Sequence, residues 1–235
     1  MYIIMAHKQR TKQKFDVNAL FKSVSAVIRR LVQTKPSDYM GASEIDLNLE
    51  SQHVARVRST VHRPRARSWV YLLNKRERKA LEVIVDNYYQ KYSQDAVYNP
   101  DLVAFLGDNP KKRLCWSAVS RKIPTLRRNA GKMFVPSLRR WMVPKEKLLL
   151  MGFPVVPSVA MSMGVPVLAI TDNRRASYVA GNCMHFSCVL LIQFLALVCF
   201  QPCTPMQASR SIAGLGNFLL DSDSEAPEAD ESELS

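Results

Sequence analysis

The stretch that decides the expected fold spans residues 140–154 and reads Arg140-Trp141-Met142-Val143-Pro144-Lys145-Glu146-Lys147-Leu148-Leu149-Leu150-Met151-Gly152-Phe153-Pro154. Proline is favoured at the first position of a helix, so we expect a short helix to begin at Pro144. Glu146 in the first turn complements the positive end of the helix dipole, and Arg140 is available to pair with it. Gly152 is suited to a left-handed helix terminator, so the helix is expected to stop there, with Pro154 just beyond.

This stretch overlaps the most basic part of the chain, residues 111–147. That part holds one acid, Glu146, and twelve bases, which are Lys111, Lys112, Arg113, Arg121, Lys122, Arg127, Arg128, Lys132, Arg139, Arg140, Lys145 and Lys147. Trp116, Phe134 and Trp141 are interleaved with them. Lysine and arginine neutralise phosphates, and aromatic rings stack on bases or wedge between them. We therefore predict that this part faces DNA; the alternative is a solvated charged surface.

Length and composition bound the class of protein. The chain has 235 residues, the size of one domain or of one domain with tails, and it is long enough to bury a core. Its net charge is +13, with 47% hydrophobic and 9% aromatic residues, which excludes a fully disordered polyelectrolyte and a collagen-like chain. Residues 221–235 hold seven acids and no base, so we expect a disordered acidic tail there.

Two helices are expected in the first half of the chain. Apolar residues recur at spacings of three and four over residues 15–33, which predicts an amphipathic helix. Residues 74–92 carry the clearest pattern, because Asn74 can cap the helix with Glu77 as the reciprocal partner of a capping box. Residues 56–67 hold five arginines, one histidine and no acid, which leaves a solvated loop and a phosphate-facing strand both open.

Residues 183–200 are almost wholly apolar, with Ser187 and Gln193 as interruptions. The run is slightly short of the roughly 20 residues that a membrane-spanning helix needs, and it lacks flanking charges and a belt of Trp or Tyr. We therefore expect a helix buried inside a layered α/β domain, with a membrane anchor as the alternative. The N-terminus turns basic directly after a short apolar run, so no secretion signal is expected.

The spacing of the cysteines does not indicate a metal or redox site. Of five, Cys183, Cys188, Cys199 and Cys203 fall within 21 residues, with His185 between two of them. None has Cys-x-x-Cys spacing, so buried free thiols in a reducing compartment are expected rather than a metal site. No Gly-x-x-x-x-Gly-Lys loop, His-Glu-x-x-His helix or Gly-x-Ser-x-Gly elbow occurs, and no pair of acids stands out as a general acid and base.

Three pieces of the chain together resemble the DNA (cytosine-5) methyltransferases, in their divergent algal and protist forms. The pieces are Pro124-Thr125-Leu126, then Arg140 to Pro154 with Glu146 and Gly152-Phe153-Pro154, then Gly181-Asn182-Cys183-Met184-His185. In that family a Pro-Thr-Leu strand lies in the target-recognition region. An Arg-x-Leu-Thr-x-x-Glu motif then ends in Leu-x-Gly-Phe-Pro, and a Gly-Asn motif leads into an apolar helix. Order and spacing agree over residues 70–200.

The resemblance implies a fold, a cofactor and a partner. The fold would be α/β, part of a doubly wound methyltransferase-like domain with an irregular target-recognition region. Gly181 and Asn182, at a turn that ends a strand, would close the wall of the S-adenosylmethionine pocket. The structural motif would be formed by Arg140, Glu146, Gly152, Phe153 and Pro154. The DNA-binding residues of this nuclear protein would be Arg121, Lys122, Arg127, Arg128, Lys132 and Arg139.

The chain departs from the family where catalysis is concerned. Val143 stands where the family has a helix-capping Thr or Ser, and loss of a cap weakens a helix start by about 0.5–2 kcal/mol. Val179 stands where many members have Gln. The nucleophilic cysteine of Pro-Cys-Gln, the Glu-Asn-Val motif and the Phe-x-Gly-x-Gly cofactor loop are absent upstream. Pro202-Cys203-Thr204 has the Pro-Cys dipeptide but follows the Gly-Asn motif, on the wrong side of it. Residues 212–218 faintly resemble the cofactor loop, which permuted members of the family place after that motif.

We therefore interpret the chain as a fragment or divergent member of this family that is inactive in methyl transfer on its own. It would be a truncated chain, a pseudoenzyme or one piece of a split enzyme, with DNA and the missing catalytic half as partners. Residues 1–70 would be a basic segment with an amphipathic helix, residues 71–205 the methyltransferase-like region and residues 206–235 the acidic tail. The rival interpretations are a non-enzymatic basic nucleic-acid-binding protein and a small membrane-anchored protein.

Overall fold

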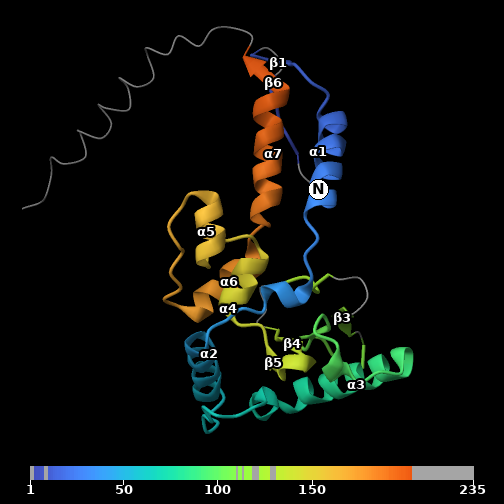
Figure 1. Cartoon of the computed structure of the whole chain (residues 1–235), viewed down its shortest axis with the longest axis vertical. Coiled ribbons are helices and arrows are strands. Elements are labelled where there is room, and N and C mark those ends of the chain that lie inside the picture. Colours follow the sequence, from blue (N-terminus) through green and yellow to red (C-terminus); the bar gives the residue numbers. More distant parts are fainter. Residues whose placement is uncertain are drawn as a thin grey trace, which may run out of the picture. The chain divides into compact units, whose positions relative to one another are not determined.

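The computed structural model describes residues 3–7, 10–109, 111–112, 114–117, 122–127 and 131–202. It combines helices with small antiparallel sheets (Figure 1). The chain divides into two compact units, one formed by Met1–Lys22 with Ile192–Ser235 and the other by Ser23–Leu191. The functional boundaries expected at residues 70 and 205 stay predictions.

The helices and strands have the following bounds. The α-helices are α1 Val17–Leu31, α2 Glu44–Val57, α3 Lys75–Tyr92, α4 Pro144–Leu150, α5 Pro157–Met163, α6 Asn173–Asn182 and α7 Phe186–Cys199. The strands are β1 Thr11–Gln13, β2 Val103–Phe105, β3 Cys115–Ser117, β4 Met133–Val135, β5 Arg140–Trp141 and β6 Phe200–Pro202. Short 3-10 helices are η1 Pro36–Tyr39, η2 Trp69–Leu72, η3 Ala96–Tyr98 and η4 Pro136–Leu138.

The first unit contains a two-stranded antiparallel sheet. β1 pairs with β6, so that Thr11 lies opposite Pro202 and Gln13 lies opposite Phe200. The backbone N–H of Lys14 donates to the carbonyl oxygen of Cys199 at 2.7 Å, which extends the pairing by one bond. Proline is tolerated in such an outer strand because it needs to donate no ladder hydrogen bond there. The sheet thus joins segments that the sequence separates by almost the whole chain.

The second unit is organised around a four-stranded antiparallel sheet in the order β3-β2-β4-β5. Ala104 of β2 lies opposite Trp116 of β3 on one side and opposite Phe134 of β4 on the other, and Phe134 lies opposite Trp141 of β5. Because successive strand residues point to opposite faces, both faces of these strands can be buried. One face packs on α2 and α3 through Ala55 and Ile84.

The opposite face of the same sheet has its own core. Val103, Phe105, Met133 and Val135 are buried there together with Met142, and Leu126 and Leu150 are packed against them. The mixed helix-and-strand class is therefore as expected. Every described strand pair is antiparallel. Within the four-stranded sheet, the described residues between β2 and β5 form no α-helix, and parallel pairing would need a crossover of that kind.

The prediction of a capped helix at residues 74–92 is confirmed. Asn74 Oδ1 accepts the backbone N–H of Glu77 at 2.8 Å, and Glu77 Oε2 accepts the N–H of Asn74 at 3.0 Å. Ile84 and Tyr88 of this helix are buried. The amphipathic helix expected at residues 15–33 is also present as α1, although none of its residues is buried.

Helix α2 was not expected from the sequence. Its N-cap is Ser43, whose Oγ accepts the N–H of Asp46 at 3.3 Å while Asp46 Oδ2 accepts the N–H of Ser43 at 3.0 Å. Arg56 and Val57 form its last turn, and the chain then runs as a loop to Arg67. The phosphate-facing strand considered for residues 56–67 is therefore wrong, and most of that segment is the loop alternative.

The prediction that residues 183–200 form a buried helix is only half right. They form α7, but Leu190, Phe194 and Leu197 are exposed, the last to 80%, and only Leu195 and Cys199 are buried. A helix that is apolar on every side has no polar face, so burying one edge leaves the others in contact with water. Among the described helices, none alone is long and apolar enough to cross a membrane; α6 and α7 pass such a test only as a pair, which is bent by 46°.

Candidate functional site

Arg140 and Glu146 form a buried, two-pronged ion pair. Arg140 Nη1 donates to Glu146 Oε2 at 2.8 Å, and Nη2 donates to Oε1 at 2.7 Å. The same carboxylate accepts the backbone N–H of Val143 at 3.0 Å and that of Ala42 at 3.2 Å. Paired hydrogen bonds between a guanidinium and a carboxylate are among the strongest in proteins. The predicted pairing is confirmed, and it also attaches the start of α2 to the start of α4.

Helix α4 begins and ends as predicted. Pro144 is its first residue, it stops at Leu150, and Gly152 follows with φ +83°. Val143 provides no side-chain cap, but the carboxylate of Glu146 accepts its N–H instead. A Cβ on Gly152 would lie 3.1 Å from the Cβ of Phe186, so a side chain there would be strained by φ and would also make a tight contact.

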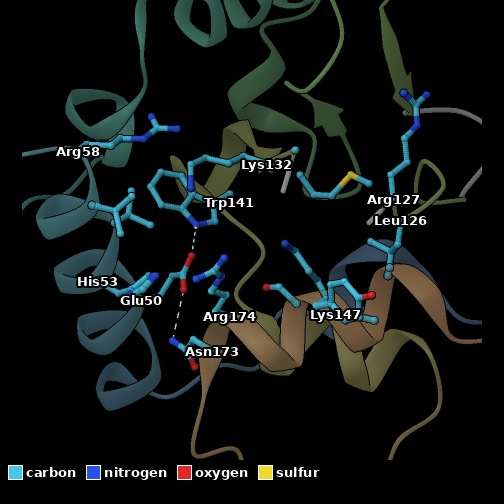
Figure 2. Close-up of a pocket in the computed structure, with 18 residues that line it drawn as sticks. Glu50, His53, Arg58, Leu126, Arg127, Lys132, Trp141, Lys147, Asn173 and Arg174 are labelled. Carbon is cyan, nitrogen blue, oxygen red and sulfur yellow. Dashed lines mark hydrogen bonds between the residues drawn. The ribbon is translucent and has the colours of Figure 1, made fainter. Parts of the chain in front are cut away.

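A cavity of about 510 Å³ lies between α2, the segment before β4, β5, α4 and α6 (Figure 2). Basic side chains dominate its lining: Arg58, Arg127, Lys132, Lys147 and Arg174. Glu50 is the single carboxylate among the described residues that line it. Its apolar wall is formed by Val54, Val57, Leu126 and Met133 beside Trp141. The cavity is therefore a positively charged hollow with an apolar side.

Glu50 is held in the wall by two neutral donors. The indole Nε1 of Trp141 donates to Glu50 Oε1 at 3.0 Å, and Asn173 Nδ2 donates to Oε2 at 3.3 Å (Figure 2). These bonds connect α2, β5 and α6 around the cavity. Both oxygens of the carboxylate are thus engaged by the frame of the cavity.

Lys132 is the most buried cation of the cavity. Only 7% of the residue is exposed, and its Nζ lies 3.7 Å from the centroid of the Trp141 ring. Burial lowers the pKa of Lys132 to about 8, and Arg58 and Lys147 add to the decrease while Glu50 opposes it. Burial also lowers the pKa of Lys147, against the opposing attraction of Glu50 and Glu146. The two ammonium groups therefore lie in surroundings that disfavour their charge.

Arg58, by contrast, has a partner of its own. Its Nη1 donates to Glu77 Oε2 at 2.6 Å, and its Nη2 donates to Oε1 at 2.8 Å. Burial alone would raise the pKa of Glu77, but the bonds from Arg58 and from the backbone of Asn74 leave the pKa lowered. The charge of Arg58 is therefore largely compensated at the base of α3.

The predicted cofactor residues lie in a different element from the one expected. Gly181 and Asn182 form the last turn of α6 rather than a turn that ends a strand. Asp172 caps that helix by accepting the N–H groups of Arg174 and Arg175, and glycine and asparagine are tolerated at a helix C-terminus. Gly181 lines the cavity, whereas the Asn182 side chain donates back to the Tyr178 carbonyl at 2.8 Å.

The predicted DNA-binding residues are divided among several places. Arg121 and Arg128 lie outside the described residues, and Lys122 and Arg139 are exposed. Lys132 is buried in the cavity and does not lie on the exposed surface.

Arg127 is exposed but already engaged. Its Nη1 is 2.6 Å from Asp108 Oδ1, its guanidinium lies over the Phe105 ring at 4.7 Å, and it points away from Glu50 and Trp141 in Figure 2. Its charge is therefore directed away from the wall that Glu50 occupies.

Sequence reasoning missed most members of the site that α2 and α6 supply, among them Glu50, His53, Asn173 and Arg174. The Ser43-x-x-Asp46 pattern was a usable signal for α2, since it is the signature of a capping box. Nothing in the sequence indicated that α2 and α6 would face each other.

Two further findings concern metal binding and similarity to known proteins. Within the described residues no group of three or more His, Cys, Asp or Glu side chains could hold a metal ion, and Cys203 lies outside them. No family model, curated protein or solved structure matches the chain significantly.

Proposed function

We propose that the chain is the target-recognition and C-terminal part of a DNA (cytosine-5) methyltransferase-like protein, which contacts DNA in the nucleus and does not transfer methyl groups alone. The observation that carries this proposal is the Arg140–Glu146 ion pair at the start of α4, followed by Gly152 at φ +83°. The resemblance implies these residues as one structural motif, and a buried ion pair with a glycine stop gives that spacing a physical reason.

The proposal also assigns a place to the sheet. The antiparallel strands β2 to β5 would be the irregular target-recognition region, and the missing catalytic half would supply the doubly wound methyltransferase core. Pro124, Thr125 and Leu126 line cavities next to the sheet, but they do not form the strand that the resemblance implies.

S-adenosylmethionine does not fit the residues that this chain provides. Its sulfonium is a cation, and the cavity that Gly181 lines already contains five basic side chains and one carboxylate. A second cavity, of about 390 Å³, borders Gly181, Cys183 and His185 and has no carboxylate among its described lining residues. Gly181 would contribute one wall of a cofactor pocket at most.

The first test of the proposal is the salt dependence of binding to duplex DNA. Replacing Arg121, Lys122, Arg127 and Arg128 together with alanine should flatten the log–log slope by several units, since each phosphate neutralised contributes about 0.9. A matched control removes four exposed bases elsewhere, namely Lys12, Lys22, Arg29 and Arg30. Fluorescence anisotropy with a labelled duplex at several salt concentrations measures both slopes. Equal flattening by the two variants would reduce the DNA contact to general charge.

The second test is methyl transfer itself. The purified chain, incubated with labelled S-adenosylmethionine and a cytosine-rich duplex, should leave the DNA unlabelled, because no Pro-Cys-Gln nucleophile is present in the sequence. The control is Cys203→Ala, which removes the cysteine that follows Pro202. Label that reaches DNA in the original chain and is lost in this variant would refute the inactive interpretation.

A further inference from the structure

The lining of the basic cavity is unbalanced in charge. Arg58 is compensated by Glu77, and Arg127 by Asp108. In the described part of the chain, no carboxylate oxygen lies within 4.0 Å of the Nζ of Lys132 or Lys147. Among the described lining residues, Lys132 is buried, Lys147 is half-buried, and neither has an ion-pair partner.

Glu50 does not correct this imbalance. Its two oxygens already accept hydrogen bonds from Trp141 and Asn173, and a single carboxylate acts on both lysines at a distance. Lys132 instead contacts the face of the Trp141 ring, a partner whose attraction for a cation is weaker than that of an anion. Exposed Arg174 adds another positive charge to the lining of the cavity.

We propose that this cavity binds the phosphate group of a small phosphate monoester, with the charge of the phosphate compensated by Lys132 and Lys147. A phosphate monoester is close to a dianion at neutral pH, so it matches two ammonium groups, and lysine binds phosphate as a point charge. This inference goes beyond the proposed DNA contact, because its two lysines lie in a cavity and not among the exposed bases.

The size and the apolar wall of the cavity define the ligand further. A volume of about 510 Å³ is within the range of small-molecule sites and exceeds what a bare phosphate ion fills. Val54, Val57 and Met133 line the same cavity, so the organic part of the ester has an apolar surface to contact. The lowered pKa of both lysines agrees with this assignment, because a bound dianion would restore the stability of their charged forms.

The first experiment measures binding by the full chain with two probes, inorganic phosphate and phenyl phosphate. At equal ionic strength both should raise the melting temperature, phenyl phosphate more than inorganic phosphate, whereas sodium chloride should not. Calorimetric titration should show at least a tenfold loss of phenyl phosphate affinity in Lys132→Met and in Lys147→Met. Lys79→Met, which removes an exposed lysine of α3, should stay within twofold. Equal effects of phosphate and chloride, or an equal loss in Lys79→Met, would overturn the proposal.

The second experiment needs no variant and so does not depend on how a variant folds. Lysines of the original chain are acetylated at pH 8 and quantified by mass spectrometry with and without phenyl phosphate. The ester should protect Lys132 and Lys147 at least fivefold and leave Lys79 unchanged. A short DNA duplex in place of the ester should not protect the two lysines. Protection by the duplex alone would make the ligand a nucleic-acid backbone and refute the small-ester site.

Discussion

Arg140 in β5 and Lys132, which directly precedes β4, are both buried cations, but their surroundings differ. Arg140 donates two hydrogen bonds to Glu146 and one to the Trp141 carbonyl, so its guanidinium is paired within its own motif. Lys132 has the face of the Trp141 ring and no carboxylate among the described residues within ion-pair distance. Arg140 is therefore paired with a carboxylate, whereas among the described residues the Nζ of Lys132 contacts an aromatic ring. Buried charge is costly unless it is paired, which distinguishes a structural role from a binding role.

The largest effect is expected when the paired cation is removed. Arg140→Met leaves the carboxylate of Glu146 buried without its cation, and breaking a buried pair in this way costs about 3–5 kcal/mol. Urea unfolding followed by circular dichroism measures the loss. The neighbouring exposed residue provides the control, Arg139→Met, which should change the free energy of unfolding by less than about 0.5 kcal/mol. Similar values for the two variants would mean that the ion pair does not stabilise the start of α4.

The opposite sign is expected when the uncompensated cation is removed. Lys132→Met should stabilise the protein at pH 7 by about 1–2 kcal/mol, because the relief of a buried charge exceeds the cation–π contact that is lost. Lys122→Met, at an exposed lysine, is the matched control and should be neutral. A destabilised Lys132→Met variant would show that the contact with Trp141 outweighs burial of the charge.

The free energy of unfolding should also depend on pH because of Lys132. The folded-state pKa of Lys132 is about 8 and its ordinary value is 10.5, so below pH 8 both states carry the proton and the full cost of burial is present. Between pH 8 and 10.5 the folded protein releases the proton first, and its stability rises with pH. The advantage of Lys132→Met over the original chain should therefore shrink across that window in parallel urea titrations. Glu50, Arg58, Glu77 and Lys147 influence this lysine and are unchanged in both proteins.

The smallest effect on stability is expected at the N-terminus of α4. Val143→Thr restores a side-chain acceptor at the N-cap position, whose backbone already has the extended conformation of a cap, at ψ 164°. A cap contributes about 0.5–1 kcal/mol, reduced here by the burial of a hydroxyl. Thermal unfolding should show a rise of a few degrees at most. Val103→Thr, at a buried position of β2, is the control and should destabilise, because its hydroxyl has no helix N-terminus to bond.

Sequence patterns predicted the parts of this protein whose causes are local. The capping box of α3, the first and last residues of α4 and the pairing of Arg140 with Glu146 depend on residues within a few positions of one another. The amphipathic α1 was predicted for the same reason. The turn expected at Gly181-Asn182 was wrong because Asp172 begins a helix whose last turn accommodates both residues.

The sequence by itself determined the net charge of +13, the helices with local caps and the motif at residues 140–154. Only the tertiary structure decided which charges are compensated. Glu50, Lys132, Lys147 and Asn173 are far apart in the sequence, and a cavity brings them together because α2 and α6 approach the same edge of the sheet. Hydrogen-bond patterns within a helix depend on spacings of three and four residues, whereas the burial of a lysine depends on every element that surrounds it. That difference is the reason why Lys132 counted as one of twelve bases in the sequence and becomes a buried, unpaired cation in the fold.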